Sequence, residues 1–209
     1  MTPQTRGAEP DILTQMGAKW TAKFTARRSK KIAAKFYWPA MPLAQRQSRL
    51  ERLNHRIQSL LKAQSDGCCS FCNKRPVEVE SVEHHAPKSR RPDLAYAWSN
   101  LFYCCGKCQA QKKEHHHAAL LKPDVEGYQF GDYFIWRFKT GRIEANPRAT
   151  PDKQRAAKVT ICLYGLNDPD HCRIRVHNRN LWRKDKTEPL GDFNYPAFVT
   201  ASAGATDTL

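Results

Sequence analysis

The most informative segment of the chain is residues 68–109, which read CCSFCNKRPVEVESVEHHAPKSRRPDLAYAWSNLFYCCGKCQ. This segment holds two C-x-x-C motifs, one near each end. Paired motifs of this kind in a reduced protein indicate zinc, because four thiolates form the closed tetrahedral site of a structural zinc ion. We therefore predict that zinc is bound by Cys69, Cys72, Cys105 and Cys108, and that its ligation contributes directly to folding stability.

Four further cysteines bear on this assignment. Cys68 and Cys104 each adjoin a predicted ligand, so either could replace its neighbour in the ligand set. Cys162 and Cys172 stand alone in the sequence, and we expect them to be small core residues.

The residues between the two motifs form an inserted unit of residues 73–104, longer than the spacing of a simple zinc ribbon. We expect a short strand, then a polar loop around Pro92-Asp93, then a helix that carries the last two cysteines. This order is a ββα-metal layout. The expected fold class is therefore α+β, with a ββα-metal core in residues 67–125 stapled by the four-cysteine zinc site.

The composition favours a polyanionic partner. The chain has 209 residues, with 35 Lys and Arg against 20 Asp and Glu, which gives a formal charge of +15. A field of this sign suits phosphate backbones, so nucleic acid is the first expected partner. No apolar run is long enough to span a membrane, and the N-terminus lacks the apolar segment of a secretory signal, so we expect a cytoplasmic protein without disulfides.

Residues 1–66 are expected to form a basic helical extension, since they carry 13 basic and 4 acidic side chains. Cations alternate with aromatic residues over residues 19–38. Two readings stay open: a nucleic-acid groove in which the rings stack on bases, or a solvated basic helix whose rings face the core. The aromatic residues concerned are Trp20, Phe24, Phe36, Tyr37 and Trp38.

A second helix is expected between Pro42 and Asp66-Gly67. Its apolar residues recur with the period of an α-helix, which predicts that one face packs on the core. The residues of this stripe are Leu50, Leu53, Ile57, Leu60 and Leu61.

Residues 126–183 are expected to add a hairpin and helices to the core. Tyr128–Phe138 is rich in β-favouring residues, and a Lys-Thr-Gly turn separates it from Arg142–Glu144. Thr150 and Pro151 then predict a helix start, with the helix running to Leu163 and ending at Gly165. Residues 184–209 are polar and small, so we expect a disordered tail.

The central segment resembles the HNH endonucleases that have a four-cysteine zinc frame. Their pattern is a C-x-x-C motif, an acid-His pair before a proline, an Asn-Leu pair, a second C-x-x-C motif and then a basic residue. Four stretches of the chain resemble, more narrowly, the PtuB-like nuclease subunits of Septu and retron-associated antiphage systems, over roughly residues 5–180. These stretches are VEHHAPKS, YAWSNL, ALLKPDVEGYQF and TICLYGLN.

The resemblance implies a role for each residue of the motif. His84 would be the general base, and Asn100 would order the loop beside the catalytic strand. Glu83 would help to hold a catalytic magnesium or manganese ion, for which hard oxygen ligands are suited. Gln109 occupies the position at which the family usually places an Asn or His ligand of that ion. The chemistry agrees, because phosphodiester hydrolysis needs a base for the attacking water and a cation for the developing charge.

Basic side chains around the motif are the predicted phosphate contacts, with solvated surface as the alternative for the last two: Lys88, Arg90, Arg91, Lys112 and Lys113. The resemblance also implies an ATPase partner of the PtuA type and, in retron versions, a reverse transcriptase with its DNA-RNA product. A different hypothesis stays open, in which the protein is a zinc-stabilised nucleic-acid-binding or assembly module whose HNH catalysis has lapsed through Gln109.

Overall fold

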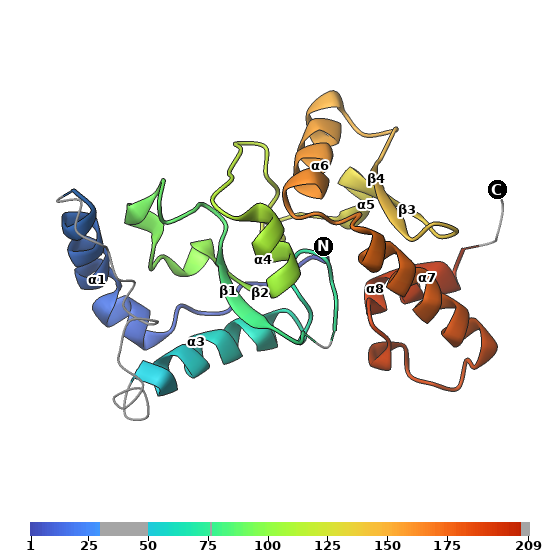
Figure 1. The fold of residues 1–209 in the computed structure, drawn as a ribbon, viewed down its shortest axis with the longest axis horizontal. Helices are drawn as coiled ribbons and strands as arrows, with labels where there is room; N and C mark the ends of the chain where they lie inside the picture. The colour runs from blue at the N-terminus through green and yellow to red at the C-terminus, as the bar shows by residue number, and fades with distance from the viewer. Residues whose placement is uncertain (30–49, 76, 206–209) are drawn as a thin grey trace.

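The computed structural model describes residues 1–29, 50–75 and 77–205. Figure 1 shows the order of its elements. The α-helices are α1 (Asp11–Ser29), α3 (Leu50–Gln64), α4 (Gly106–Lys112), α5 (Phe130–Tyr133), α6 (Pro151–Leu163), α7 (Pro169–Lys184) and α8 (Pro196–Ala203). The strands are β1 (Glu80–His84), β2 (Leu101–Cys105), β3 (Phe134–Arg137) and β4 (Arg142–Ala145), and the short 3-10 helices are η1 (Pro92–Leu94), η2 (Trp98–Asn100) and η3 (Leu190–Asp192).

The fold is α+β, as the sequence predicted, and the described residues form two small antiparallel sheets. In the first sheet β1 pairs with β2, so that Glu80 lies opposite Cys105 and His84 opposite Leu101. All five residues of β2 are buried, which explains why this strand is a continuous apolar run rather than an alternating one. The helix α4 follows β2 without a linker and packs against both strands.

The helix α1 packs on the central segment through aromatic contacts. The ring of Trp20 lies 5.4 Å from that of Tyr96, and the ring of Phe24 lies 6.5 Å from it. Both α1 rings are buried, so for these two residues the core-facing reading is confirmed and the base-stacking reading is wrong. The other aromatic residues of that stretch, Phe36, Tyr37 and Trp38, lie outside the described residues.

The helix α3 confirms the second predicted helix over Leu50–Gln64, while residues 42–49 lie outside the described part. Ile57 and Leu61 are buried, whereas Leu60 is 41% exposed and stands at the edge of the apolar stripe. The helix ends at Gln64. Asp66 and Gly67, which follow it, have positive φ angles, and the Gly67 amide donates to the carbonyl of Lys62. This is the C-terminal geometry that favours glycine.

The predicted hairpin is present as β3 and β4, with Phe134 opposite Ala145. It is shorter than predicted, because Phe130–Tyr133 forms the helical turn α5. Gly141 is required in the turn: its φ angle is +70°, and a β-carbon there would collide with the backbone carbonyl of Cys172.

The helix α6 begins and ends where the sequence predicted. The Thr150 hydroxyl accepts a hydrogen bond from the Lys153 amide, and Pro151 is the first helical residue. The chain leaves the helix at Gly165, whose φ angle is +59°. Cys162 is exposed, so its prediction as a core residue is wrong, because it lies on the face of α6 away from the buried Ala157. Cys172 is only half-buried.

The predicted disorder of residues 184–209 is wrong for η3 and α8. Phe198 is fully buried, and its ring lies 5.1 Å from that of Trp136 and 5.4 Å from that of Phe138. Val199 is buried beside it. Two apolar side chains therefore order a segment whose average composition is small and polar, while residues 206–209 lie outside the described part.

One hydrophobic core joins the segments that the sequence analysis divided. It includes Leu13 of α1, Ile57 of α3, Leu101 of β2, Phe134 of β3 and Phe198 of α8. No helix in the described ranges combines the length and the hydropathy that crossing a membrane requires.

Candidate functional site

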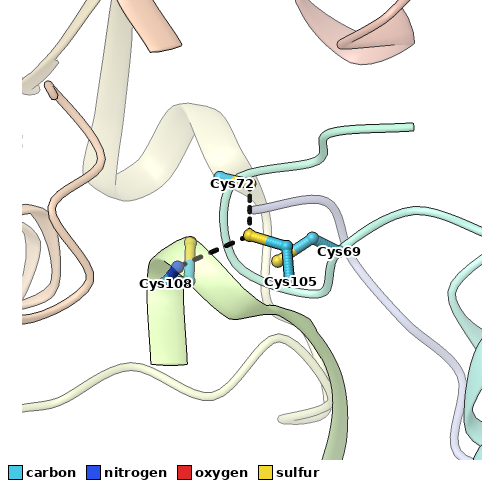
Figure 2. Close-up of side chains that lie close together, drawn as sticks. All are labelled: Cys69, Cys72, Cys105 and Cys108. Carbon is cyan, nitrogen blue, oxygen red and sulfur yellow. Dashed lines mark hydrogen bonds between the residues drawn. The ribbon is translucent and has the colours of Figure 1, made fainter. Parts of the chain in front are cut away.

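Four buried cysteines form a cluster at the junction of the two C-x-x-C motifs (Figure 2). The Sγ atoms of Cys69, Cys72, Cys105 and Cys108 all lie within 4.8 Å of one another. The Sγ atoms of Cys72 and Cys105 are 3.8 Å apart. Four thiol ligands converging in a buried space can hold a metal ion, and this donor set is consistent with structural zinc.

The backbone turns at both motifs explain why the cysteines converge. At the first motif the Asn73 amide donates to the Cys69 carbonyl, and Asn73 adopts a positive φ angle that an Asn side chain tolerates well. At the second motif Cys105 ends β2 and caps α4, and its sulfur accepts from the Cys108 amide at 3.5 Å. Each turn therefore directs two sulfurs to one point.

The two neighbouring cysteines are not part of the converging set. The Cys104 thiol donates to the Cys105 carbonyl at 3.4 Å, and burial raises the pKa of the Cys68 thiol to about 11. Hydrogen bonds from neighbouring thiols, led by Cys104 and then Cys108, hold the pKa of Cys105 well below its usual range. The geometry thus brings the four predicted cysteines together in one cluster that could hold a metal ion.

A cavity of about 160 Å³ brings together the remaining residues of the motif. Glu83 and His84 from the end of β1 line it, and so does Gln109 from α4. Gln109 is distant in sequence from Glu83 and His84. The pairing of β1 with β2 and the packing of α4 against both strands place the three residues together. The full lining is Glu83, His84, Pro87, Lys88, Gln109, Lys113 and Glu114.

His84 is buried and held by the backbone. Its Nε2 lies 2.9 Å from the carbonyl oxygen of Ala95. A carbonyl can only accept, so Nε2 carries the proton and Nδ1 carries the lone pair when the ring is neutral. Burial, with a smaller contribution from Lys88, lowers the pKa of His84 to about 3, so the ring is neutral.

Glu83 is paired with a buried lysine. Lys112 Nζ lies 2.6 Å from Glu83 Oε1 and 2.9 Å from the backbone carbonyl of His84. Burial raises the pKa of Glu83 to about 7, and Lys112 opposes this shift. The prediction of Lys112 as a phosphate contact or solvated side chain is wrong, since this side chain is fully buried.

The burial of Lys112 has a signal in the sequence, which its spacing from Cys108 carries. Lys112 lies four residues after Cys108, and residues at this spacing share one face of a helix. Because Cys108 must face the interior as a metal ligand, Lys112 one turn later faces the interior too. A buried ammonium then requires an acidic partner, and Glu83 is that partner.

Asn100 closes the loop between β1 and β2. Its Oδ1 accepts from the Ala86 amide at 2.7 Å, and its Nδ2 donates to the carbonyls of Ala86 at 2.9 Å and Leu94 at 3.0 Å. The side chain is buried, so these bonds replace those that water would make. Asn100 thus orders the segment that leads away from His84.

Gln109 and Glu114 complete the wall of the cavity. Gln109 Nε2 donates weakly to the carbonyl of Val82, at 3.4 Å. The Ser89 hydroxyl donates to the carboxylate of Glu114, a residue that the sequence analysis did not single out. Within the described ranges, only the four cysteines bring three or more His, Cys, Asp or Glu ligand atoms together. The cavity therefore does not present a converged set of ligands for a divalent cation.

The remaining predicted phosphate contacts differ in their surroundings. Lys88 is half-buried and lines the cavity together with the exposed Lys113. Arg90 is exposed. Arg91 pairs with the carboxylate of Asp93, with its Nη2 at 2.6 Å. Its charge is therefore partly neutralised locally.

Comparison of the chain with known proteins finds no matching family model and no matching curated protein.

Proposed function

We propose that this protein is an HNH-type endonuclease that hydrolyses phosphodiester bonds of nucleic acid at the cavity beside the four-cysteine cluster. The observation that carries the proposal is the shared cavity of Glu83, His84 and Gln109. Lys88 and Lys113 line the same cavity and offer cations to a phosphate group. The four cysteines would hold a structural zinc that fixes the strand pair and α4 around the cavity.

His84 is suited to the role of general base in this reaction. Its bond to the Ala95 carbonyl fixes the tautomer, so Nδ1 can accept a proton from an attacking water. The water oxygen would bond to phosphorus as the bond to the leaving oxygen breaks. Asn100 would act as a positioning residue, because it orders the loop next to His84 without lining the cavity.

A magnesium or manganese ion would stabilise the charge on the leaving oxygen, and Glu83 and Gln109 are the residues that the resemblance assigns to it. The arrangement of these residues does not fit the ion as it stands, because Glu83 is already paired with Lys112. The same pair favours the second candidate function, a nucleic-acid-binding or assembly module in which catalysis has lapsed.

We further propose that the nuclease acts as the effector of an antiphage system under the control of an ATPase partner. This proposal rests on the resemblance to PtuB-like subunits and on the absence of a P-loop motif from the printed sequence, so that ATP use would belong to the partner. A retron reverse transcriptase with its DNA-RNA product is the further partner that the resemblance implies.

The test is cleavage of plasmid DNA, single-stranded DNA and cellular RNA by the wild type and by His84→Ala, with magnesium or manganese and with or without the candidate ATPase. His115→Ala is the matched control, because His115 is exposed and does not line the cavity. We expect cleavage by the wild type and the control and a loss of about a hundredfold or more in His84→Ala. Equal cleavage by both variants would overturn the nuclease assignment, and binding without cleavage by the wild type would favour the lapsed module.

A further inference from the structure

Lys112 is the last residue of α4 and lies entirely inside the protein, with none of its side chain exposed. Its ammonium contacts Glu83 Oε1 at 2.6 Å and the His84 carbonyl at 2.9 Å. The Glu83 side chain is 5% exposed. The two opposite charges are thus withdrawn from solvent together, and Glu83 of this pair lines the cavity in which hydrolysis is proposed.

The charge balance of this pair limits what else Glu83 can bind. An ammonium and a divalent cation would compete for the same carboxylate. If both were present, they would lie only a few ångströms apart, in surroundings that screen charge poorly. The cavity lining offsets little of this repulsion, because its other carboxylate, Glu114, is balanced by the cations of Lys88 and Lys113, and Gln109 is neutral.

We infer that Lys112 is an internal cation that occupies Glu83 in place of a divalent metal ion and so sets the metal affinity of the cavity. The inference rests on the proposed function in one respect, since it concerns the same cavity. In this role Lys112 is a positioning residue, which acts through its contacts with the Glu83 carboxylate and the His84 carbonyl. A purely structural ion pair would differ, because its loss would destabilise the fold without creating affinity for a metal ion.

The experiment measures Mn²⁺ binding to zinc-loaded protein by electron paramagnetic resonance, without nucleic acid. Lys112→Met removes the ammonium and keeps most of the side-chain volume. We expect its affinity for Mn²⁺ to exceed that of the wild type by about tenfold or more, because Glu83 is released. Unchanged affinity in a folded Lys112→Met protein would overturn the inference.

Two controls locate the effect. Lys113→Met removes a neighbouring cation that lines the same cavity but is exposed, and we expect a change of less than about threefold. In the double variant Lys112→Met with Glu83→Gln the gained affinity should disappear. An equal gain of Mn²⁺ affinity in Lys113→Met would show that the affinity depends on the net charge of the cavity rather than on Glu83. Persistence of the gained affinity in the double variant would show the same.

A second measurement uses the wild type, in case Lys112→Met does not fold. Amine acylation followed by mass spectrometry reports the exposure of each lysine. We expect Lys112 to react about tenfold or more slowly than Lys113, and to stay protected as Mn²⁺ is raised to millimolar concentration. Acylation of Lys112 at micromolar Mn²⁺ would overturn the inference, because the metal would then displace the lysine easily.

These outcomes are distinguishable from a failure of the proposed function. Gain of Mn²⁺ binding in Lys112→Met, with no cleavage of any nucleic acid by the wild type, would support the internal cation and reject the nuclease. His84-dependent cleavage, with no gain of Mn²⁺ binding in Lys112→Met, would support the nuclease and reject the internal cation.

Discussion

The side chain of Asn100 pairs with the backbone of Ala86 in both directions, accepting from its amide at 2.7 Å and donating to its carbonyl at 2.9 Å. The Asn100 amide group also reaches the Leu94 carbonyl, so one side chain fixes two points of the loop between β1 and β2. This loop begins next to His84. The geometry of the proposed base therefore depends on a residue sixteen positions away that does not line the cavity.

Replacing Asn100 with alanine should lower the free energy of unfolding by about 2 to 4 kcal/mol, because three buried hydrogen bonds are lost and the backbone groups of Ala86 are left unpaired. Urea denaturation of zinc-loaded protein measures this difference. Ser99→Ala is the control, since Ser99 is an exposed neighbour, and it should change stability by less than about 0.5 kcal/mol. Similar losses in the two variants would contradict the loop-ordering role.

Replacing Cys108 with serine should abolish stoichiometric zinc binding and the cooperative thermal unfolding transition, because the cluster contributes its ligation energy to folding. Metal content by mass spectrometry and circular dichroism melting check both effects. Cys162→Ser serves as the control, since Cys162 is exposed and does not belong to the cluster. A Cys108→Ser protein that kept one zinc per chain would contradict the ligand set.

The stability of the protein should fall as the pH is lowered from about 6.5 toward 3, in part through His85. Burial, reinforced by Lys122 and His116, lowers the pKa of His85 from 6.5 to about 3. In this pH window the unfolded state binds a proton that the folded state does not, so the free energy of unfolding declines by up to about 1.4 kcal/mol per pH unit for this residue.

His85→Gln checks the contribution of this histidine. The variant should be less stable than the wild type at pH 7.5, because the contact of Nε2 with the Leu121 carbonyl at 3.2 Å is altered. Its stability should then decline less steeply below pH 6.5. Denaturation at a series of pH values, with zinc saturating in each, gives the two slopes, and parallel curves would show that His85 is not neutral in the fold.

Nucleic-acid affinity should fall steeply with salt, because each neutralised phosphate releases condensed counterions. The double variant Arg90→Gln with Lys113→Gln should lower the slope of log affinity against log salt by about 2 on duplex DNA. Both side chains are exposed, and Lys113 lines the cavity. Arg137→Gln is the control, because Arg137 pairs with Glu144 in the hairpin. An unchanged slope in the double variant would show that nucleic acid binds at another surface of the protein.

Phe198→Ala should destabilise the protein by about 3 to 5 kcal/mol, since it empties a buried site between Trp136 and Phe138. Thr200→Ala, at an exposed position of the same helix, should be nearly neutral. Chemical denaturation compares the two. A small effect of Phe198→Ala would mean that the C-terminal helix contributes little to the core.

Several elements could be predicted from local signals alone. The helix α6 was predicted to the residue because Thr150, Pro151 and Gly165 act through short-range geometry. The convergence of the four cysteines followed from spacing, since a C-x-x-C motif constrains its two sulfurs locally. The length of the first hairpin strand was not predictable in this way, because the helical turn α5 competes for the same aromatic residues.

The average composition of the C-terminal segment was also misleading about its order. An average over residues 184–209 is polar and small, but folding depends on whether particular side chains find a partner. Phe198 finds one in the hairpin, which lies about sixty residues earlier in the chain. No local pattern reports such a contact.

The sequence by itself determined the four-cysteine cluster and the caps of α6, because these depend on residue spacing and on the local backbone. The predicted helix carrying both last cysteines is wrong for Cys105, which ends the strand β2. Only the tertiary structure decided that Lys112 is buried against Glu83 and that Trp20 faces the core. The physical reason is desolvation. Whether a cation or a ring meets water or another side chain depends on which segments pack against it, and this determines whether Glu83 is open to a metal ion or already neutralised.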